Sequence, residues 1–264
     1  LAEPLTAGVR DDETAGDYFV RKFGREAYHN LVEPLFGGIY GSDPAEMPGE
    51  YALRTMRRME RSGSLLRAVV RRRLDGDERP PPVSFDGGMA QLPRALYERN
   101  ADRIELSTPV ERIVPAETGY RLETDGGSRR VDHVVVTTRA DVAADLLADV
   151  DAESAGALET LSYNPLAYVH LASPADPAGY GYQVRHDEPL HTLGVTWNAG
   201  LFDRDGVYTC FLGGMSNPEL VDRPDRELGR IAREEFETVM DARAEVLSVT
   251  RHRQGIPAYD GSWT

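Results

Sequence analysis

The stretch ETAGDYFVRKFGREAYHNLVEPLFGGIYGSDP, residues Glu13–Pro44, decides the fold of the first part of the chain. Its apolar residues recur at helical spacing, and Gly24 predicts a break between two short helices. We expect Gly37–Gly38 to end the second helix, because glycine lacks a Cβ and leaves the backbone bare for close approach. A glycine cap followed by a loop explains the pair, and a backbone placed against a ligand is the alternative. Ser42–Pro44 predicts a further turn. The apolar positions are Tyr18, Phe19, Phe23, Ala27, Leu31 and Leu35.

The composition is that of a packed globular protein. The chain has 264 residues, of which 41% are hydrophobic, and a mean hydropathy of −0.45. Such values are ordinary for a folded domain and argue against disorder. A single cysteine, Cys210, excludes an internal disulfide framework and a cysteine-rich metal site. No apolar run approaches the roughly 18 residues of a membrane-spanning helix.

The charge balance indicates the environment more than the chemistry. Lys22 is the only lysine among 30 basic residues, and 44 acidic residues give a net charge of −14. An acidic surface almost free of lysine suits high salt, where screening reduces the repulsion between carboxylates. We therefore expect a salt-loving host. The same balance disfavours a nucleic-acid partner, which calls for a basic surface.

A local basic cluster interrupts this acidic chain. Several of its arginines share one face of a predicted helix, and apolar residues follow them. Docking on an anionic membrane and guidance of a carboxylate-bearing substrate are both open interpretations, and so is a solvated helix face paired with Glu50 and Glu60. The cluster consists of Arg54, Arg57, Arg58, Arg61, Arg67, Arg71, Arg72 and Arg73.

The order of patterns predicts an α+β fold with a helical lobe and a mixed or antiparallel sheet. We expect a helical region over 1–74 and a proline-rich linker over 75–82. Further helices are predicted over 92–99, 140–147, 152–161 and 224–240. Strands are predicted over 103–106, 111–114, 120–124, 131–137, 167–171, 181–185, 190–197, 207–213 and 246–251.

No conventional catalytic constellation is present in the sequence. The motifs H-E-x-x-H, C-x-x-C and G-x-S-x-G do not occur, which counts against a zinc enzyme and a hydrolase. We therefore predict no catalytic side chain and no metal ligand, and we expect the histidines to be surface or structural residues. The scattered histidines are His29, His133, His170, His186, His191 and His252.

Several segments, taken together, resemble the oxygen-dependent protoporphyrinogen oxidases of the flavin-containing amine oxidase superfamily. The opening stretch carries the longest part of this resemblance, and the other segments follow in the family's order across essentially the whole chain. They are Ser64-Leu65-Leu66, FDGGMAQLPRAL at Phe85–Leu96, TPVERI at Thr108–Ile113, GYGYQV at Gly179–Val184, FLGG at Phe211–Gly214 and GIPAY at Gly255–Tyr259.

The resemblance implies an FAD-linked oxidase divided into three regions. Residues 1–82 would form a helical lobe on the substrate or membrane side with its linker, 83–150 part of the FAD-supporting region, and 151–264 an antiparallel-sheet substrate-binding domain. Enzymes of this superfamily bind the FAD pyrophosphate at a G-x-G-x-x-G turn, which this sequence lacks; Gly179 and Gly181 come nearest, with Val184 at the third position. We therefore expect a central fragment, without the N-terminal Rossmann segment, that by itself neither holds FAD nor turns over substrate.

The resemblance also implies a substrate pocket with aromatic and aliphatic walls and close backbone. Tyr180, between two glycines, matches the family's aromatic residue that packs on the tetrapyrrole, although it could equally be a core residue. Gln183 departs from the family's aliphatic residue, and a buried glutamine would need hydrogen-bond partners. The implied substrate-binding residues are Gly38, Tyr180, Gly181, Gln183, Leu193, Thr196 and Phe211.

Only a few flavin contacts are implied. Val110 would meet the adenine, and Thr137 and Thr138 would lie near the phosphates. Ile256, Pro257 and Tyr259 would approach the ring system, although Ala258 interrupts the family's usual I-P-Q-Y. From the residues alone, the run before Thr137 is simply a buried strand.

The implied reaction, in haem biosynthesis, oxidises protoporphyrinogen IX to the porphyrin with dioxygen as acceptor. Gln183 keeps coproporphyrinogen III open as the substrate, because a polar pocket residue suits an additional propionate. The alternatives are another flavin amine oxidase, a desaturase-type oxidoreductase and a non-catalytic binding domain. We expect a cytoplasmic protein; peripheral contact with the cytoplasmic face of a membrane and the oligomeric state stay open.

Overall fold

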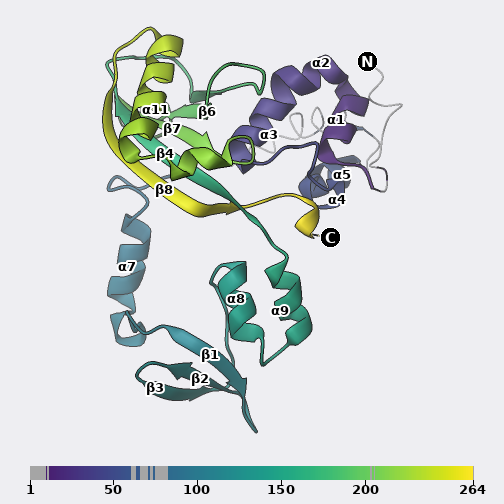
Figure 1. The fold of residues 1–264 in the computed structure, drawn as a ribbon, viewed down its shortest axis with the longest axis vertical. Coiled ribbons are helices and arrows are strands. Elements are labelled where there is room, and N and C mark those ends of the chain that lie inside the picture. Colours follow the sequence, from purple (N-terminus) through teal and green to yellow (C-terminus); the bar gives the residue numbers. More distant parts are fainter. Residues whose placement is uncertain are drawn as a thin grey trace. The chain divides into compact units, whose positions relative to one another are not determined.

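The computed structural model describes residues 10, 12–60, 64, 65, 71, 74, 83–202, 204 and 206–263. They form helices and antiparallel sheets in two compact units (Figure 1). Unit 1 consists of Leu1–Pro82 and Tyr163–Thr264, and unit 2 of Val83–Ser162. The predicted α+β class is therefore confirmed, whereas the division into three functional regions stays a prediction. The predicted linker over 75–82 and the arginines at 61, 67, 72 and 73 lie outside the described residues.

Unit 1 begins with short helices and continues with a sheet. The helices of its first part are α1 (Ala15–Phe23), α2 (Arg25–Ala27), the π-helix η2 (Tyr28–Val32), α3 (Glu33–Tyr40), α4 (Gly49–Ala52) and α5 (Arg54–Glu60). The strands of its second part are β4 (Tyr163–Ala172), β5 (Gly181–Gln183), β6 (Thr192–Trp197), β7 (Val207–Gly213) and β8 (Glu245–Pro257). Further helices are α10 (Asn198–Phe202), η4 (Pro218–Asp222), α11 (Asp225–Met240) and η5 (Gly261–Trp263).

The helix break predicted at Gly24 is confirmed. Thr14 caps α1 by accepting a hydrogen bond from the Asp17 backbone N–H at 3.1 Å. Gly24 then takes a φ of 84° between α1 and α2, a conformation that favours glycine. Of the predicted apolar stripe, Tyr18 and Phe19 are buried, whereas Leu31 is 68% exposed. Other residues complete this core: Tyr28, Val32, Phe36, Met47, Leu53 and Leu65.

The helix end predicted at Gly37–Gly38 is wrong. Helix α3 runs through both glycines to Tyr40 and ends at Gly41, which has a left-handed φ of 59°. The absent side chain at position 38 serves packing instead, because a Cβ at Gly38 would overlap the Gln183 carboxamide. The turn predicted at Ser42–Pro44 is present, with the Asp43 carboxylate accepting a hydrogen bond from the Ala45 N–H at 2.8 Å.

The only lysine of the chain is buried in the helical part. Lys22 forms an ion pair with Glu60 on α5, and the two side chains are 0% and 2% exposed. The ammonium group also lies 5.3 Å from the centre of the Tyr18 ring. Glu60 therefore pairs with Lys22, and its pairing with the arginine cluster stays a prediction.

The five strands of unit 1 form one antiparallel sheet in the order β5-β6-β7-β4-β8. Alternate residues of each strand face opposite sides. One side, which we call the covered face, packs against α11 and η4 (Figure 1). We call the other side the open face. The core between the covered face and the helices includes Ala167, Val169, Leu171, Val195, Tyr208, Cys210, Leu212, Leu220, Leu228, Ile231 and Phe236.

The covered face buries titratable side chains as well as apolar ones. Cys210 is fully buried there, and burial raises the pKa of its thiol to about 12. Burial also raises the pKa of Tyr182 on the same face. The carboxylate of Glu235, on α11, is buried and accepts hydrogen bonds from the backbone N–H groups of His191 and Thr192 at 2.8 and 2.9 Å. These contacts fix the start of β6 against α11.

Unit 2 contains a three-stranded antiparallel sheet, β1 (Val110–Pro115), β2 (Tyr120–Thr124) and β3 (Gly127–Val131), with helices α7 (Gln91–Arg99), η3 (Ala101–Arg103), α8 (Ala140–Leu147) and α9 (Ala152–Glu159). Its core lies where α8 packs on α9 and β1, around Ile113 and Ala144. Two predicted strands are wrong. Residues 104–106 form no strand after η3, and β3 ends at Val131 because the following valine run is unpaired, with Val135 85% exposed.

Candidate functional site

The open face carries a continuous row of residues from β5 to β8. Gln183 pairs with Gly194, Gly194 with Phe211, Phe211 with Tyr168, and Tyr168 with Thr250. The Phe211 and Tyr168 rings meet edge to face with their centres 5.5 Å apart. Such a row offers a broad, partly aromatic surface that is free of charge along these strands.

A second row on the same face joins more of the residues implied by the resemblance. Gly181 pairs with Thr196, and Thr196 with Thr209. Gly181, Thr196 and the two residues Gln183 and Phe211 of the first row therefore share one face. Leu193 lies at a shift in the register between β6 and β7. A Cβ added to Gly214 would lie 3.1 Å from the Leu193 Cδ1 atom. The structure thus brings together residues that are widely spaced in sequence.

Helix α3 closes one end of the open face. A Cβ built at Gly38 would lie 1.6 Å from the Gln183 Oε1 atom, so only glycine permits this approach. One turn later, a Cβ at Gly41 would lie 2.8 Å from the Ile256 Cδ1 atom of β8. Gly38 thus lies against Gln183 of the same chain, and its contact with a substrate stays a prediction. Gln183 is itself exposed, so it does not need the hydrogen-bond partners that a buried glutamine would require.

A buried asparagine, which the sequence analysis missed, joins α3 to the sheet. Asn164 on β4 donates hydrogen bonds from Nδ2 to the Gly41 carbonyl and the Ser42 hydroxyl, both at 2.8 Å. The same hydroxyl accepts a hydrogen bond from the Tyr259 N–H at 3.2 Å, and the Tyr40 and Tyr259 rings lie 5.1 Å apart. Asn164 thereby holds the end of the opening stretch beside the Ile256–Tyr259 segment.

Tyr180 lies in a bend directly before β5. Its side chain is 69% exposed. The flanking Gly179 and Gly181 have φ values of 115° and 150°, and a Cβ at Gly181 would lie 2.2 Å from the Val195 carbonyl oxygen. The two glycines are therefore explained by the backbone conformation and, at Gly181, by the close approach to β6. The exposed Tyr180 ring is available to contact another molecule.

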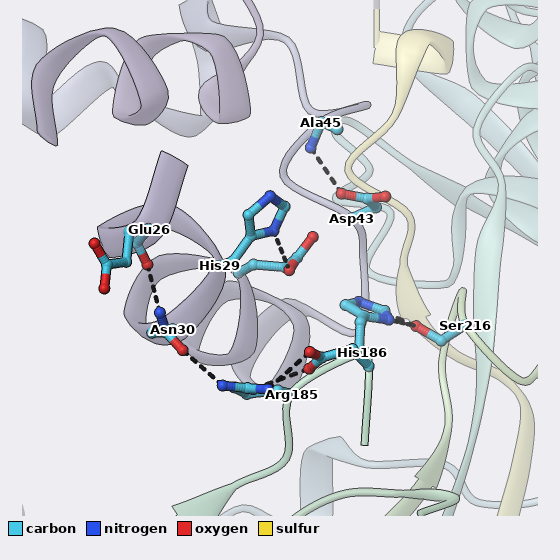
Figure 2. Close-up of polar contacts among 10 residues, drawn as sticks. Glu26, His29, Asn30, Asp43, Ala45, Arg185, His186 and Ser216 are labelled. Atoms are coloured by element: carbon cyan, nitrogen blue, oxygen red, sulfur yellow. Dashed lines mark hydrogen bonds and ion pairs between the residues drawn. The ribbon is translucent and has the colours of Figure 1, made fainter. Parts of the chain in front are cut away.

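A small pocket lies beside Gly37 and Gly38, between α3 and the turn that follows β5. Figure 2 shows the polar contacts of Arg185 and His186, which line it. Its volume is about 40 Å³, room for no more than a few water molecules. Arg185 in this turn donates to the Asn30 Oδ1 atom at 2.7 Å and forms an ion pair with Asp187. The neighbouring His186 hydrogen-bonds to Ser216 at 3.3 Å. These contacts tie the turn to η2 and to the end of β7.

The implied flavin contacts fall in both units. In unit 2, Val110 is half-buried at the start of β1, and Thr137 and Thr138 are exposed in the extended segment after β3. In unit 1, Ile256 and Pro257 end β8 and are half-buried. Tyr259, which is also half-buried, follows them.

The aromatic part of the open face extends further than the sequence analysis predicted. Tyr168 touches Phe211 on one side, and the centres of the Tyr168 and His252 rings are 5.7 Å apart on the other. Burial raises the pKa of the Tyr168 hydroxyl. His252 is exposed, which agrees with its predicted surface position. Strand alternation with Phe211 as the starting point is the signal that would have found Tyr168.

Within the described ranges, no group of three or more histidine, cysteine, aspartate or glutamate residues is placed to hold a metal ion. The helices of the described part of the chain are also too short or too polar to cross a membrane.

Comparison of the sequence with known protein families identifies the family to which the chain belongs. The family model described as flavin containing amine oxidoreductase matches residues 2–263. The chain belongs to this family. The family accounts for the α+β architecture and for the association of the chain with flavin chemistry.

Relatives of known description include porphyrinogen oxidases. The chain is 25% identical over 253 residues to the chloroplastic protoporphyrinogen oxidase of Oryza sativa subsp. japonica, covering 82% of the chain and 47% of the relative. It is 24% identical over 278 residues to the coproporphyrinogen III oxidase of Bacillus subtilis (strain 168), covering 95% of the chain and 58% of the relative. The chain thus spans about half the length of the curated relatives it matches.

Solved structures agree on the fold. A crystal structure from Exiguobacterium sp. 255-15, provisionally assigned as a protoporphyrinogen oxidase, superposes with a TM-score of 0.74 at 25% identity, covering 96% of this chain and 57% of that one. A redesigned putrescine oxidase superposes with a TM-score of 0.63 at 14% identity, covering 94% of this chain and 57% of its own. The second likeness concerns the fold alone.

Proposed function

We propose that the protein containing this chain is an FAD-dependent oxidase that converts protoporphyrinogen IX or coproporphyrinogen III to the porphyrin, with dioxygen as acceptor. The observation that carries the proposal is the open face of the five-stranded sheet. Gly181, Gln183, Thr196 and Phe211 lie together on it, and Gly38 touches it from α3. Relatives described as oxidases of these two substrates support the same reaction.

The chemistry of the open face suits a large macrocycle. Phe211 and Tyr168 provide half-buried aromatic surface, and Leu193 is aliphatic. Flat apolar rings bind to such surfaces mainly by burial of area, and a few polar groups fix their orientation. The pocket beside α3, at about 40 Å³, is too small for the ring. The ring would therefore lie on the open face itself.

The residues present fit an edge of FAD rather than its whole binding site. Val110 offers a half-buried apolar contact, and Thr137 and Thr138 are exposed, so their hydroxyls are able to donate hydrogen bonds to phosphate oxygens. Pro257 and Tyr259 would lie toward the ring system. When bound, FAD supplies the two-electron oxidation of the substrate. The work of this chain's residues is then to bind and orient the macrocycle and to exclude water from it.

The proposed setting is haem biosynthesis in the cytoplasm of a salt-loving host. Peripheral contact with a membrane belongs to the same proposal, because helices η2 and α3 expose Leu31 (68%) and Ile39 (57%). Exposed leucine and isoleucine side chains, together with a basic helix such as α5 in the same unit, are features that interfacial binding uses.

The deciding experiment follows porphyrin fluorescence from each porphyrinogen, using the flavin-loaded protein that contains this chain. Oxidation above the rate without protein, with consumption of dioxygen, is the expected result. Amine or desaturase substrates in parallel assays test the other reactions of the superfamily. Turnover of one of those substrates, with no porphyrin formed, would contradict the proposal, and a complete absence of turnover would favour a non-catalytic binding domain.

A further inference from the structure

The Gln183 carboxamide occupies a slot between two glycines that are far apart in sequence. A Cβ at Gly38 on α3 would lie 1.6 Å from the Gln183 Oε1 atom, and a Cβ at Gly194 on β6 would lie 2.5 Å from the same atom. A side chain at either position would displace the amide. Gln183 is nevertheless exposed. The slot therefore orients the amide without covering it.

The amide has hydrogen-bonding capacity to spare. No hydrogen bond joins the Gln183 side chain to any residue in the described part of the chain, although a carboxamide has two N–H donors and an acceptor oxygen. Its neighbours in the row are Gly194 and Phe211, which offer no side-chain partner. An oriented, unused amide on a largely apolar surface is suited to recognising one polar group of a ligand.

Charged groups nearby are already engaged. The Arg185 guanidinium is held by Asp187 and by the Asn30 Oδ1 atom, and His186 hydrogen-bonds to Ser216. A carboxylate arriving on this part of the open face would therefore meet Gln183 as a neutral donor, rather than a free arginine. Hydrogen bonds to ionised acceptors are stronger than those between neutral groups.

We propose that Gln183 makes the site selective for coproporphyrinogen III by donating a hydrogen bond from Nε2 to a propionate. This inference rests on the proposed function. The two candidate substrates share the macrocycle and its pyrrole N–H groups, and differ at side groups that are propionates in coproporphyrinogen III and vinyl groups in protoporphyrinogen IX. A vinyl group accepts no such bond and leaves the exposed amide facing hydrocarbon, which penalises binding.

The test compares kcat/KM for both substrates in the flavin-loaded protein and its Gln183→Leu variant. We expect the value for coproporphyrinogen III to fall by about tenfold, the size of one hydrogen bond to a charged group. The value for protoporphyrinogen IX should stay within about twofold or rise, because leucine suits a vinyl group. Gln183→Glu should lower coproporphyrinogen use further, since its carboxylate repels the propionate.

Gln91→Leu, on α7 of unit 2, is the matched control and should leave the ratio of the two values unchanged. Thermal unfolding of each variant shows that it is folded. Equal losses for both substrates would mean that the amide contacts a group they share, and unchanged values would mean that it contacts neither; both results overturn the inference while leaving the proposed function intact. If the parent protein oxidises neither porphyrinogen, the proposed function fails and the inference falls with it.

Discussion

On the covered face of the sheet, Cys210 and Leu212 are fully buried beneath α11, whereas Phe211 between them points to the open face and is half-buried. The same strand therefore contributes to a core on one side and to a candidate binding surface on the other. The covered face is lined by aliphatic and aromatic side chains packed against one another, and the open face combines aromatic rings with hydroxyls, an amide and glycines. Stability and binding are thus assigned to alternate residues, which makes their contributions separable by mutation.

The largest expected effect is on stability, from the covered face. Leu212→Ala should lower the free energy of unfolding by about 2–5 kcal/mol, because it removes a buried side chain and leaves a cavity. Phe211→Ala should cost clearly less stability, since that ring is only half-buried, and should instead lower kcat/KM for the porphyrinogen. Urea unfolding monitored by circular dichroism measures the first quantity. Equal destabilisation by both variants would show that the two faces do not divide these roles.

A smaller effect, of roughly 2 kcal/mol in kcat/KM, is expected for Tyr180→Ala. Because Tyr180 is 69% exposed, its removal should leave the unfolding midpoint nearly unchanged. Tyr180→Phe preserves the ring and should have a mild effect, which makes it the control. Indistinguishable, negligible effects of the two substitutions on kcat/KM would remove Tyr180 from the binding surface.

The covered face should also make stability depend on alkaline pH. Burial raises the pKa of Cys210 from 9.0 to about 12 in the folded protein, so the unfolded chain loses this proton first as the pH rises. The stabilisation that the buried neutral Cys210 thiol contributes is complete below pH 9. It is lost between pH 9 and about 12, by about 1.4 kcal/mol of unfolding free energy per pH unit.

Denaturant titrations at several pH values measure this loss. Cys210→Ala is the control, because it removes the titrating thiol and should flatten the slope by that amount. A slope that is the same in both proteins would indicate that the thiol ionises freely within the folded state.

The smallest effect concerns the outer surface rather than either face. With 44 acidic residues and a net charge of −14, the melting temperature should rise by several degrees between dilute buffer and molar KCl, because salt screens repulsion and strengthens apolar burial. Leu212→Ala should show the same rise from a lower starting point. A melting temperature that is flat across this range would contradict adaptation to high salt.

Sequence patterns predicted many of the helices and strands, because the spacing of apolar residues along the chain is enough to indicate these elements. Strand alternation located β7 at Val207–Gly213, and a helical stripe located α11 to within one residue. The valine run before Thr137 misled the analysis, because a strand also needs a pairing partner. The Gly37–Gly38 pair was also misleading, since the missing side chain at Gly38 allows packing against Gln183 and the pair forms no turn.

The resemblance predicted several residues of the candidate site. The residues that join these to the rest of the fold are recognised only from tertiary contacts. The resemblance named Gln183, Thr196 and Phe211, and the register of the sheet places them on one face. Nothing in a sequence marks Asn164 as the residue that holds Gly41 and Ser42, because an isolated asparagine in a strand has no pattern. Tyr168 is likewise recognised only once its pairing with Phe211 is known.

The burial of Lys22 has a practical consequence. The chain has no other lysine, and this side chain is 0% exposed in its pair with Glu60. Acylating reagents that modify lysine can reach it only when the packing between α1 and α5 opens. The rate at which mass spectrometry detects acylation at this position therefore reports how often the helical part opens, without the introduction of any probe.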